Sequence, residues 1–81
     1  MKITLKYFAA LREAVKKGEE VVEVPEGIDV SGLRTLLIEK HPGLRDIMET
    51  TLPIVNTEYV GGDRVLEDRD VVAFIPPVSG G

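Results

Sequence analysis

The segment from Val71 to Ile75 is apolar at every position and runs directly into Pro76 and Pro77. An uninterrupted apolar run of this length is typical of a strand in the interior of a sheet, whereas a strand with one face in water alternates apolar and polar residues. Proline fixes its own φ and has no N–H to donate, so the strand has to end there. The run predicts an interior strand whose neighbours come from the rest of the chain.

The rest of the chain switches between the period of a strand and that of a helix. We expect a strand over 2–7, a helix over 8–17, a strand over 19–24, a main helix capped by Asp29 or Ser31 that ends near Lys40, a helical turn within 43–51, and short strands over 54–56, 59–60, 65–66 and 71–75. A polar reversal at Thr57-Glu58 separates two of the short strands. Two apolar sets are expected to face the core: Ile3, Leu5 and Tyr7 in the first strand, and Phe8, Leu11 and Val15 in the first helix.

This order of elements predicts an α+β fold. Because the main helix lies between two groups of strands, we expect a mixed sheet wrapped around it, with the first and last strands adjacent and parallel. Such a roll is of the ubiquitin-like, β-grasp kind. The predicted division is a β-grasp domain over residues 1–75 and an extended tail over residues 76–81. One face of the sheet covers the helix, and the other is left to solvent or to a partner.

Composition narrows the classes of partner. The 81 residues include 10 Lys and Arg against 14 Asp and Glu, and the net charge of −4 argues against nucleic acid or an anionic membrane as the main partner. Cysteine is absent, which excludes a disulfide framework, a thiolate metal site and side-chain thiol chemistry. The first residues lack the apolar core of a signal peptide, and no segment approaches transmembrane length, so we expect a cytoplasmic protein.

The last residues of the sequence suggest a chemical role for the tail. Pro77 pushes Pro76 toward an extended conformation, which gives the tail a set direction as it leaves the domain. Gly80 and Gly81 lack a Cβ and can pass through a channel too narrow for other residues. The Gly81 carboxylate is inert until it is activated, for example as an acyl-adenylate. A chain without cysteine can carry sulfur only at such a terminus or on a bound ligand.

Three segments resemble the small subunit of molybdopterin synthase. They are the opening residues 6–13, the pair Val55-Asn56 with Tyr59-Val60, and the closing residues 66–81, which end in the pattern Pro-Pro-x-x-Gly-Gly. The resemblance spans the whole chain. One departure is Arg69, in the turn before the last strand, where that family often has glycine. The resemblance therefore does not predict the conformation of this turn.

The resemblance implies a mechanism and a set of partners. An ATP-dependent adenylating enzyme would activate Gly81, sulfur from a persulfide would replace AMP, and the resulting thiocarboxylate would donate its sulfur to cyclic pyranopterin monophosphate. The chain would bind no cofactor or metal of its own and would act as a non-catalytic subunit, in a heterotetramer with a large subunit. The residues expected to enter a partner's active site are Pro76, Pro77, Val78, Ser79 and Gly80. The residues expected at the partner interface are Tyr59, Phe74 and Ile75.

Two other classes of function stay open. A β-grasp carrier with the same tail chemistry could serve thiamine synthesis, tRNA thiolation or conjugation to protein lysines, although thiamine-pathway carriers are usually shorter and lack the Pro-Pro exit. A ubiquitin-like interaction module with an inert tail is the third hypothesis.

The single histidine, His41, is expected to have a surface role at a helix end. The acidic run from Glu67 to Asp70 is expected to be a solvated turn and not a metal loop.

Overall fold

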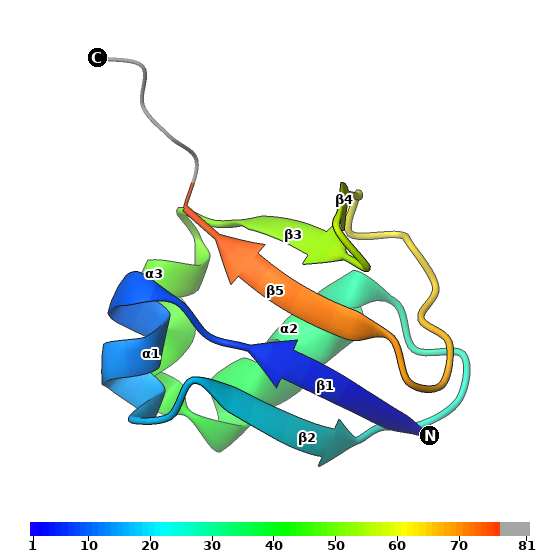
Figure 1. Cartoon of the computed structure of the whole chain (residues 1–81), viewed down its shortest axis with the longest axis horizontal. Helices are drawn as coiled ribbons and strands as arrows, with labels where there is room; N and C mark the ends of the chain where they lie inside the picture. The colour runs from blue at the N-terminus through cyan, green and yellow to red at the C-terminus, as the bar shows by residue number, and fades with distance from the viewer. Residues whose placement is uncertain (77–81) are drawn as a thin grey trace.

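The structure is a computed structural model that describes residues 1–76 (Figure 1). Its elements are β1 (Lys2–Lys6), α1 (Ala9–Val15), β2 (Glu19–Glu23), α2 (Val30–Lys40), the 3₁₀ turn η1 (Pro42–Leu44), α3 (Arg45–Met48), β3 (Leu52–Val55), β4 (Glu58–Tyr59) and β5 (Val71–Ile75). The predicted order of strands and helices is confirmed, with boundaries that shift by one or two residues, except for the strand expected over 65–66.

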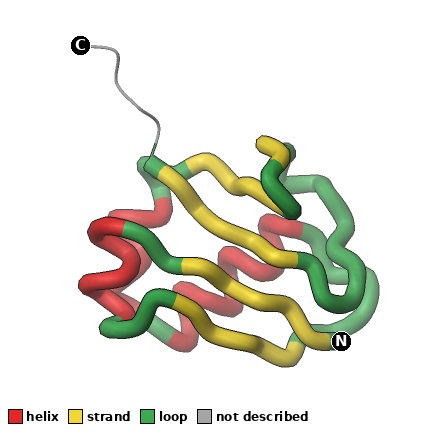
Figure 2. Tube along the Cα trace, viewed as in Figure 1, coloured by secondary structure: helices red, strands yellow, loops and turns green. Residues whose placement is uncertain are grey.

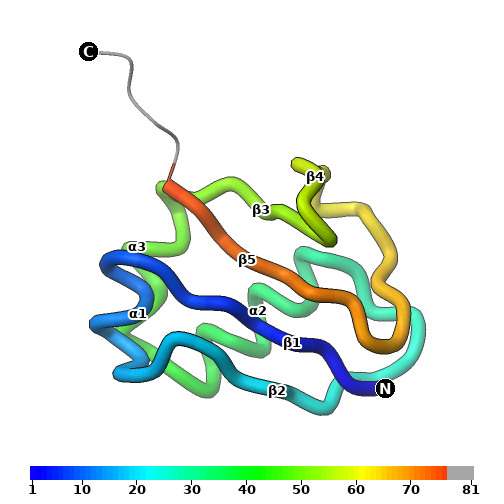
Figure 3. The backbone as a smooth tube through the Cα atoms, viewed as in Figure 1, coloured from blue at the N-terminus to red at the C-terminus, as the bar shows by residue number. Residues whose placement is uncertain are grey.

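The last strand lies in the middle of the sheet, as its apolar run predicts. The five strands are ordered β2-β1-β5-β3-β4. β5 pairs in parallel with β1, where Thr4 is opposite Val71, and antiparallel with β3, where Val55 is opposite Val72. Figure 3 shows the first and last strands side by side in the sheet, the blue β1 next to the orange β5. The prediction that the first and last strands are adjacent and parallel is therefore confirmed.

The main helix covers one face of this sheet. α2 begins after Asp29, whose side chain caps the helix by accepting a hydrogen bond from the Gly32 N–H at 2.8 Å. Figure 2 shows α2 behind the strands and α1 and α3 beside one end of the sheet, and no element within residues 1–76 covers the opposite face. The fully buried side chains between sheet and helices are Tyr7, Ile3, Leu5, Leu11, Leu33, Leu37, Leu44, Met48, Val30 and Val72. The result is the predicted α+β roll with a mixed sheet on one main helix.

Phe8 differs from the prediction that it faces the core with Leu11 and Val15. Its backbone is still extended, with φ −128° and ψ 154°, and α1 begins only at Ala9. Successive side chains of an extended chain point to opposite faces, and Tyr7 points into the core. Phe8 therefore lies on the open face, where 47% of its surface is exposed.

The reversal between β3 and β4 comes one residue earlier than predicted, at Asn56-Thr57. Both residues have positive φ, 49° for Asn56 and 75° for Thr57. A two-residue turn with positive φ at both positions matches the right-handed twist of a hairpin. The turn pairs Val55 with Glu58 and places Tyr59 opposite Ile54.

Residues 65–66 do not form the expected strand of the sheet. Val65 makes a single isolated bridge with Asp29, and the Leu66 N–H donates to the Ile28 carbonyl at 2.9 Å. Leu66 is buried, so this segment fixes the start of the main helix to the core instead of extending the sheet.

Asp70 corrects the prediction that the acidic run is simply solvated, because it is only 5% exposed. Its carboxylate accepts hydrogen bonds from the Glu67 N–H and the Asn56 side-chain amide, both at 2.8 Å, and lies 3.4 Å from the Arg64 guanidinium. Burial acts to raise the pKa of Asp70, but these three partners hold it below its ordinary value. The turn is thereby tied to the β3–β4 hairpin.

Arg69 adopts the left-handed conformation, with φ at 69°. Its N–H donates to the Lys2 carbonyl at 2.7 Å, which fixes the turn against β1. Glycine reaches this region without steric cost. The structure thus gives the conformation that the resemblance left open: the turn keeps a backbone suited to glycine although an arginine occupies it.

Candidate functional site

The chain leaves the domain from the centre of the sheet. β5 ends at Ile75, and the exposed Pro76 follows it. Figure 1 shows this end of β5 close to the start of α1 and to the connection between α3 and β3. Of the predicted tail, Pro76 is described by the structure. Pro77, Val78, Ser79, Gly80 and Gly81 lie outside the described residues, so their predicted roles stay predictions.

The two faces of β5 differ in their surroundings. Val72 and Phe74 point toward the helices and are 0% and 2% exposed. Val71, Ala73 and Ile75 point to the open face, because side chains alternate along a strand. In the neighbouring strand β3, Ile54 is opposite Ala73 and Leu52 is opposite Ile75.

These side chains gather into an apolar surface that we call the open-face patch. Its members are Phe8, Leu52, Ile54, Tyr59, Val71, Ala73 and Ile75. Tyr59 is 66% exposed, and Phe8 and Leu52 are each 47% exposed. A shallow depression of about 260 Å³ lies between Phe8, Ile54 and Ile75. A contiguous exposed apolar surface on a small domain marks an interaction site, and this one adjoins the point where the tail begins.

The predicted interface residues divide between the two faces. The structure places Tyr59 and Ile75 on the open-face patch, where a partner has access to them. Phe74 lies in the core instead, and the prediction that its side chain contacts a partner is wrong for the folded domain. Because all five residues of this strand are apolar, the sequence did not show which of them face outward.

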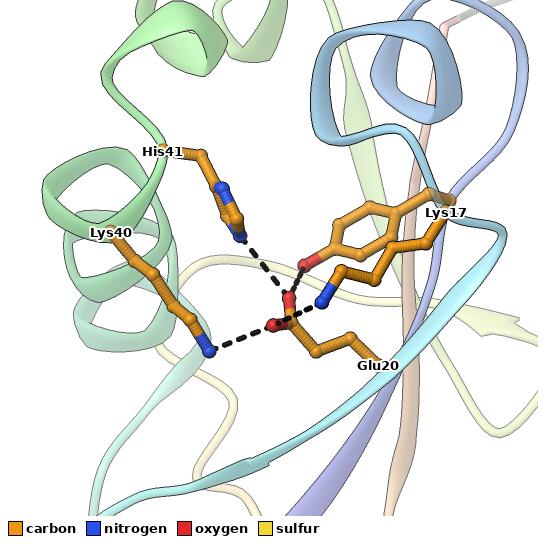
Figure 4. Close-up of polar contacts among 5 residues, drawn as sticks. Lys17, Glu20, Lys40 and His41 are labelled. Atoms are coloured by element: carbon orange, nitrogen blue, oxygen red, sulfur yellow. Dashed lines mark hydrogen bonds and ion pairs between the residues drawn. The ribbon is translucent and has the colours of Figure 1, made fainter.

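Sequence reasoning missed a polar cluster around Glu20, the second residue of β2 (Figure 4). The Glu20 side chain is 6% exposed and meets two lysines, Lys40 at 2.7 Å and Lys17 at 3.2 Å. It also accepts a hydrogen bond from the Tyr7 hydroxyl at 2.7 Å and lies 3.3 Å from His41 Nε2. The cluster joins the ends of α1 and α2 to the sheet.

The electrostatics of this cluster favour an ionised carboxylate. Burial acts to raise the pKa of Glu20, but Lys40, Tyr7, Lys17 and His41 together lower it to about 2. Burial, with the hydrogen bond to Glu20, raises the pKa of the Tyr7 phenol. His41, predicted to lie at the surface without a partner, thus contacts Glu20. The two residues are 21 positions apart, so no local pattern could have paired them.

We expect the stability of the domain to fall in acid because of Glu20. Its pKa is about 2 in the folded chain and 4.5 in the unfolded chain, so between these values the unfolded chain binds more protons. The stabilisation is complete above pH 4.5 and is lost as the pH falls toward 2; it amounts to about 3 kcal/mol. The lowered pKa of Asp70 acts in the same direction. Urea denaturation between pH 7 and pH 2 measures this loss, and a flat profile would contradict it.

Comparison with known proteins decides the family. Residues 5–81 match the ThiS family. The chain is 43% identical to the molybdopterin synthase sulfur carrier subunit of Mycobacterium tuberculosis, over 100% of this chain and 99% of that relative. The chain belongs to the ThiS family.

Solved structures agree with the fold of a ThiS family member. A putative molybdopterin converting factor subunit 1 from Pyrococcus furiosus has a TM-score of 0.88 and 32% identity, covering 96% of this chain and 99% of that one. The small archaeal modifier protein SAMP1 from Haloferax volcanii also has a TM-score of 0.88, with 25% identity over the full length of both chains. These neighbours confirm the ubiquitin-like β-grasp fold.

Within residues 1–76, no group of three or more His, Cys, Asp or Glu side chains is arranged to hold a metal ion. No helix in this same part of the ThiS family chain is long and apolar enough to cross a membrane.

Proposed function

We propose that this chain is the sulfur-carrying small subunit of a molybdopterin synthase. The observation that carries the proposal is the full-length similarity to a relative of that name, including the Gly-Gly end of the sequence. The place where the chain leaves the domain supports it, because Pro76 follows an interior strand that pairs with β1 on one side and β3 on the other. A tail anchored in this way leaves the domain from a fixed point.

The proposed chemistry takes place at Gly81 and uses groups that belong to partners. An ATP-dependent adenylating enzyme joins the Gly81 carboxylate to AMP and releases pyrophosphate. The terminal sulfur of a persulfide donor then displaces AMP and forms an acyl disulfide, and a thiol cleaves its S–S bond, which leaves a terminal thiocarboxylate and a disulfide on the donor. This sulfur is donated to cyclic pyranopterin monophosphate in the active site of the large subunit. The chain supplies the carrier carboxyl group and the surface that positions it.

We infer that the open-face patch is the docking surface for the large subunit and for the adenylating enzyme. A partner that receives the tail has to contact the domain near Pro76, and the patch is the exposed apolar surface at that point. Ile75 joins the two, since it is the last residue of β5 and also lines the depression of the patch.

The substitution Ile75→Glu is expected to weaken binding to the large subunit by about tenfold or more, because it places a charge in a desolvated apolar contact. Folding should be little affected, since Ile75 is not part of the buried core. Titration calorimetry with the purified large subunit measures the change. Val65→Glu is the matched control, because Val65 is 54% exposed but lies outside the patch. Equal affinities for the two variants would reject the patch as the docking surface.

The intact mass of the chain tests the proposed carrier role. After incubation with ATP, the adenylating enzyme and a sulfur donor, the mass should rise by the difference between one sulfur and one oxygen, and fragmentation should locate the change at Gly81. Addition of the large subunit and cyclic pyranopterin monophosphate should then return the mass to its original value. No mass change, with the enzyme shown to be active on another carrier, would reject the proposal.

A second candidate is a protein modifier, and the similarity to a small archaeal modifier protein favours it. The same Gly81 acyl-adenylate would then be attacked by a lysine amine of a target protein, which forms an amide and releases AMP. Mass spectrometry of tryptic peptides from the host would detect lysines that carry residues 70–81 of this chain, because trypsin cuts after Arg69 and no basic residue follows it. Such adducts would support modification, and their absence together with sulfur loading would support the carrier role alone.

A further inference from the structure

The strand β2 forms one edge of the sheet, and no strand within residues 1–76 pairs with its outer backbone groups. Met1 and Val24 exchange two backbone hydrogen bonds of 2.9 Å, and the Tyr7 N–H donates to the Gly18 carbonyl at 2.9 Å at the other end. In an antiparallel pair, bonded and non-bonded positions alternate. The residues whose backbone N–H and C=O point away from β1 are therefore Glu19, Val21 and Glu23.

A groove runs beside this edge, between β2 and the main helix. It has a volume of about 440 Å³, and its walls are formed by the apolar side chains of Val22, Val24, Leu33, Leu36 and Leu37. Val21 lies above the groove on the other side of the strand and is 58% exposed. The edge therefore offers hydrogen-bonding backbone and an apolar groove in the same place, which is the combination that an added β-strand needs.

The charges around the edge select one kind of occupant. Glu23 and Glu39 stand on the rim of the groove, and Glu19 begins the strand. Lys40, the basic residue on the rim, is engaged by Glu20 at 2.7 Å. Glu19 has only a loose contact of 3.7 Å with Lys6, and both side chains are about half exposed. Lys2 is opposite Glu23, and Lys6 is opposite Glu19, but both lysines belong to β1 and lie inside the edge. The outermost charges of β2 are therefore acidic, and pairing with the same edge of a second copy would bring like charges together.

We propose that the β2 edge binds an extended basic segment of a partner protein, which adds a sixth strand to the sheet. Its backbone pairs with Glu19, Val21 and Glu23, and every second side chain, small and apolar, enters the groove against Val22. The side chains between these face the open side, where basic residues meet Glu19 and Glu23. The strand β1 lies between this edge and β5, the nearest strand of the open-face patch. The proposed site therefore differs from the patch and goes beyond the proposed carrier function.

A synthetic peptide with the core Lys-Val-Thr-Val-Lys tests the proposal on the full chain. In an NMR titration, we expect shifts at the amides of Glu19, Val21 and Glu23 and at the methyl groups of Val22 and Leu36. A peptide with glutamate in place of both lysines should bind about tenfold more weakly, and so should one with the central amide N-methylated. Equal binding of all three peptides, shifts confined to the open-face patch, or no shifts at millimolar peptide would overturn the proposal.

Charge reversal on the protein provides the matching test. The double variant Glu19→Lys/Glu23→Lys should lose affinity for the lysine peptide about tenfold and gain affinity for the glutamate peptide. The control is Glu13→Lys/Glu49→Lys, which changes the net charge equally at two exposed positions outside the groove. Thermal unfolding of both variants verifies that they are folded. If both double variants lose affinity equally, the attraction is one of overall charge and the site is rejected.

Discussion

Deletion of Gly81 is expected to abolish sulfur loading and to leave the folded domain unchanged. The loss should be complete, because the carboxylate of the new last residue, Gly80, stands one position too short for the site that activates it. Stability should change by less than about 0.5 kcal/mol, as expected for a change away from buried contacts. The basis for this is that the described core ends at Phe74 and that Pro76 is already exposed. Intact mass after loading and the melting temperature measure the two effects.

Two further variants test whether the loss of sulfur loading is specific to the Gly81 carboxylate. An alanine added after Gly81 lengthens the tail by one residue and converts the Gly81 carboxylate into a peptide bond, so loading at Gly81 should again be absent. Gly43→Ala is the matched change of a glycine inside the domain, where an added Cβ would meet no atom within 4 Å. It should load normally. A chain that is still loaded without Gly81 would contradict every carrier mechanism, and a deletion without any functional effect would favour an interaction module with an inert tail.

The sequence predicted the sheet well because its strands carry strong local patterns. The apolar run of β5 required an interior position, and the alternation of Ile3, Leu5 and Tyr7 identified the buried face of β1. Asp29 could be proposed as a helix cap from its place before the main helix. Each of these features is determined by residues that are close together in the chain.

The faces of short segments were harder to predict, because their patterns are ambiguous. The position of Phe8 fits both the helical spacing of α1 and the alternation of β1. Its backbone is extended, so its side chain follows the alternation of β1. Phe74 and Ile75 are both apolar, and only the covering helices distinguish them. The open-face patch was therefore predicted in part, with Tyr59 and Ile75 but without Phe8 and Leu52.

The polar clusters could not be predicted, because they join residues far apart in the chain. Asn56 reaches Asp70 across 14 positions, and Glu20 reaches His41 across 21. Nothing in the local pattern of these residues differs from that of a solvated charge. The fold brings them together, and burial then makes their hydrogen bonds matter.

The substitution Glu20→Gln is expected to destabilise the domain by about 2–3 kcal/mol, since it removes the negative charge that two lysines and His41 surround. Glutamine has nearly the same volume and can still accept the hydrogen bond from the Tyr7 hydroxyl, so the loss reports mainly on charge. For a domain of this size, it corresponds to a melting temperature about 10–20 °C lower. Urea and thermal denaturation at pH 7 measure both quantities.

Glu19→Gln is the control that separates this effect from a general change of charge on β2. Glu19 is the preceding residue of the same strand, but its contact with Lys6 is 3.7 Å and exposed, so the cost should be below about 0.5 kcal/mol. The acid profile gives a second, independent readout. Because Glu20→Gln has no carboxyl group to protonate, most of the stability loss between pH 4.5 and pH 2 should disappear in it and persist in Glu19→Gln. Equal destabilisation of the two variants, or an unchanged acid profile in Glu20→Gln, would show that the cluster does not hold α1 and α2 to the sheet through its charge.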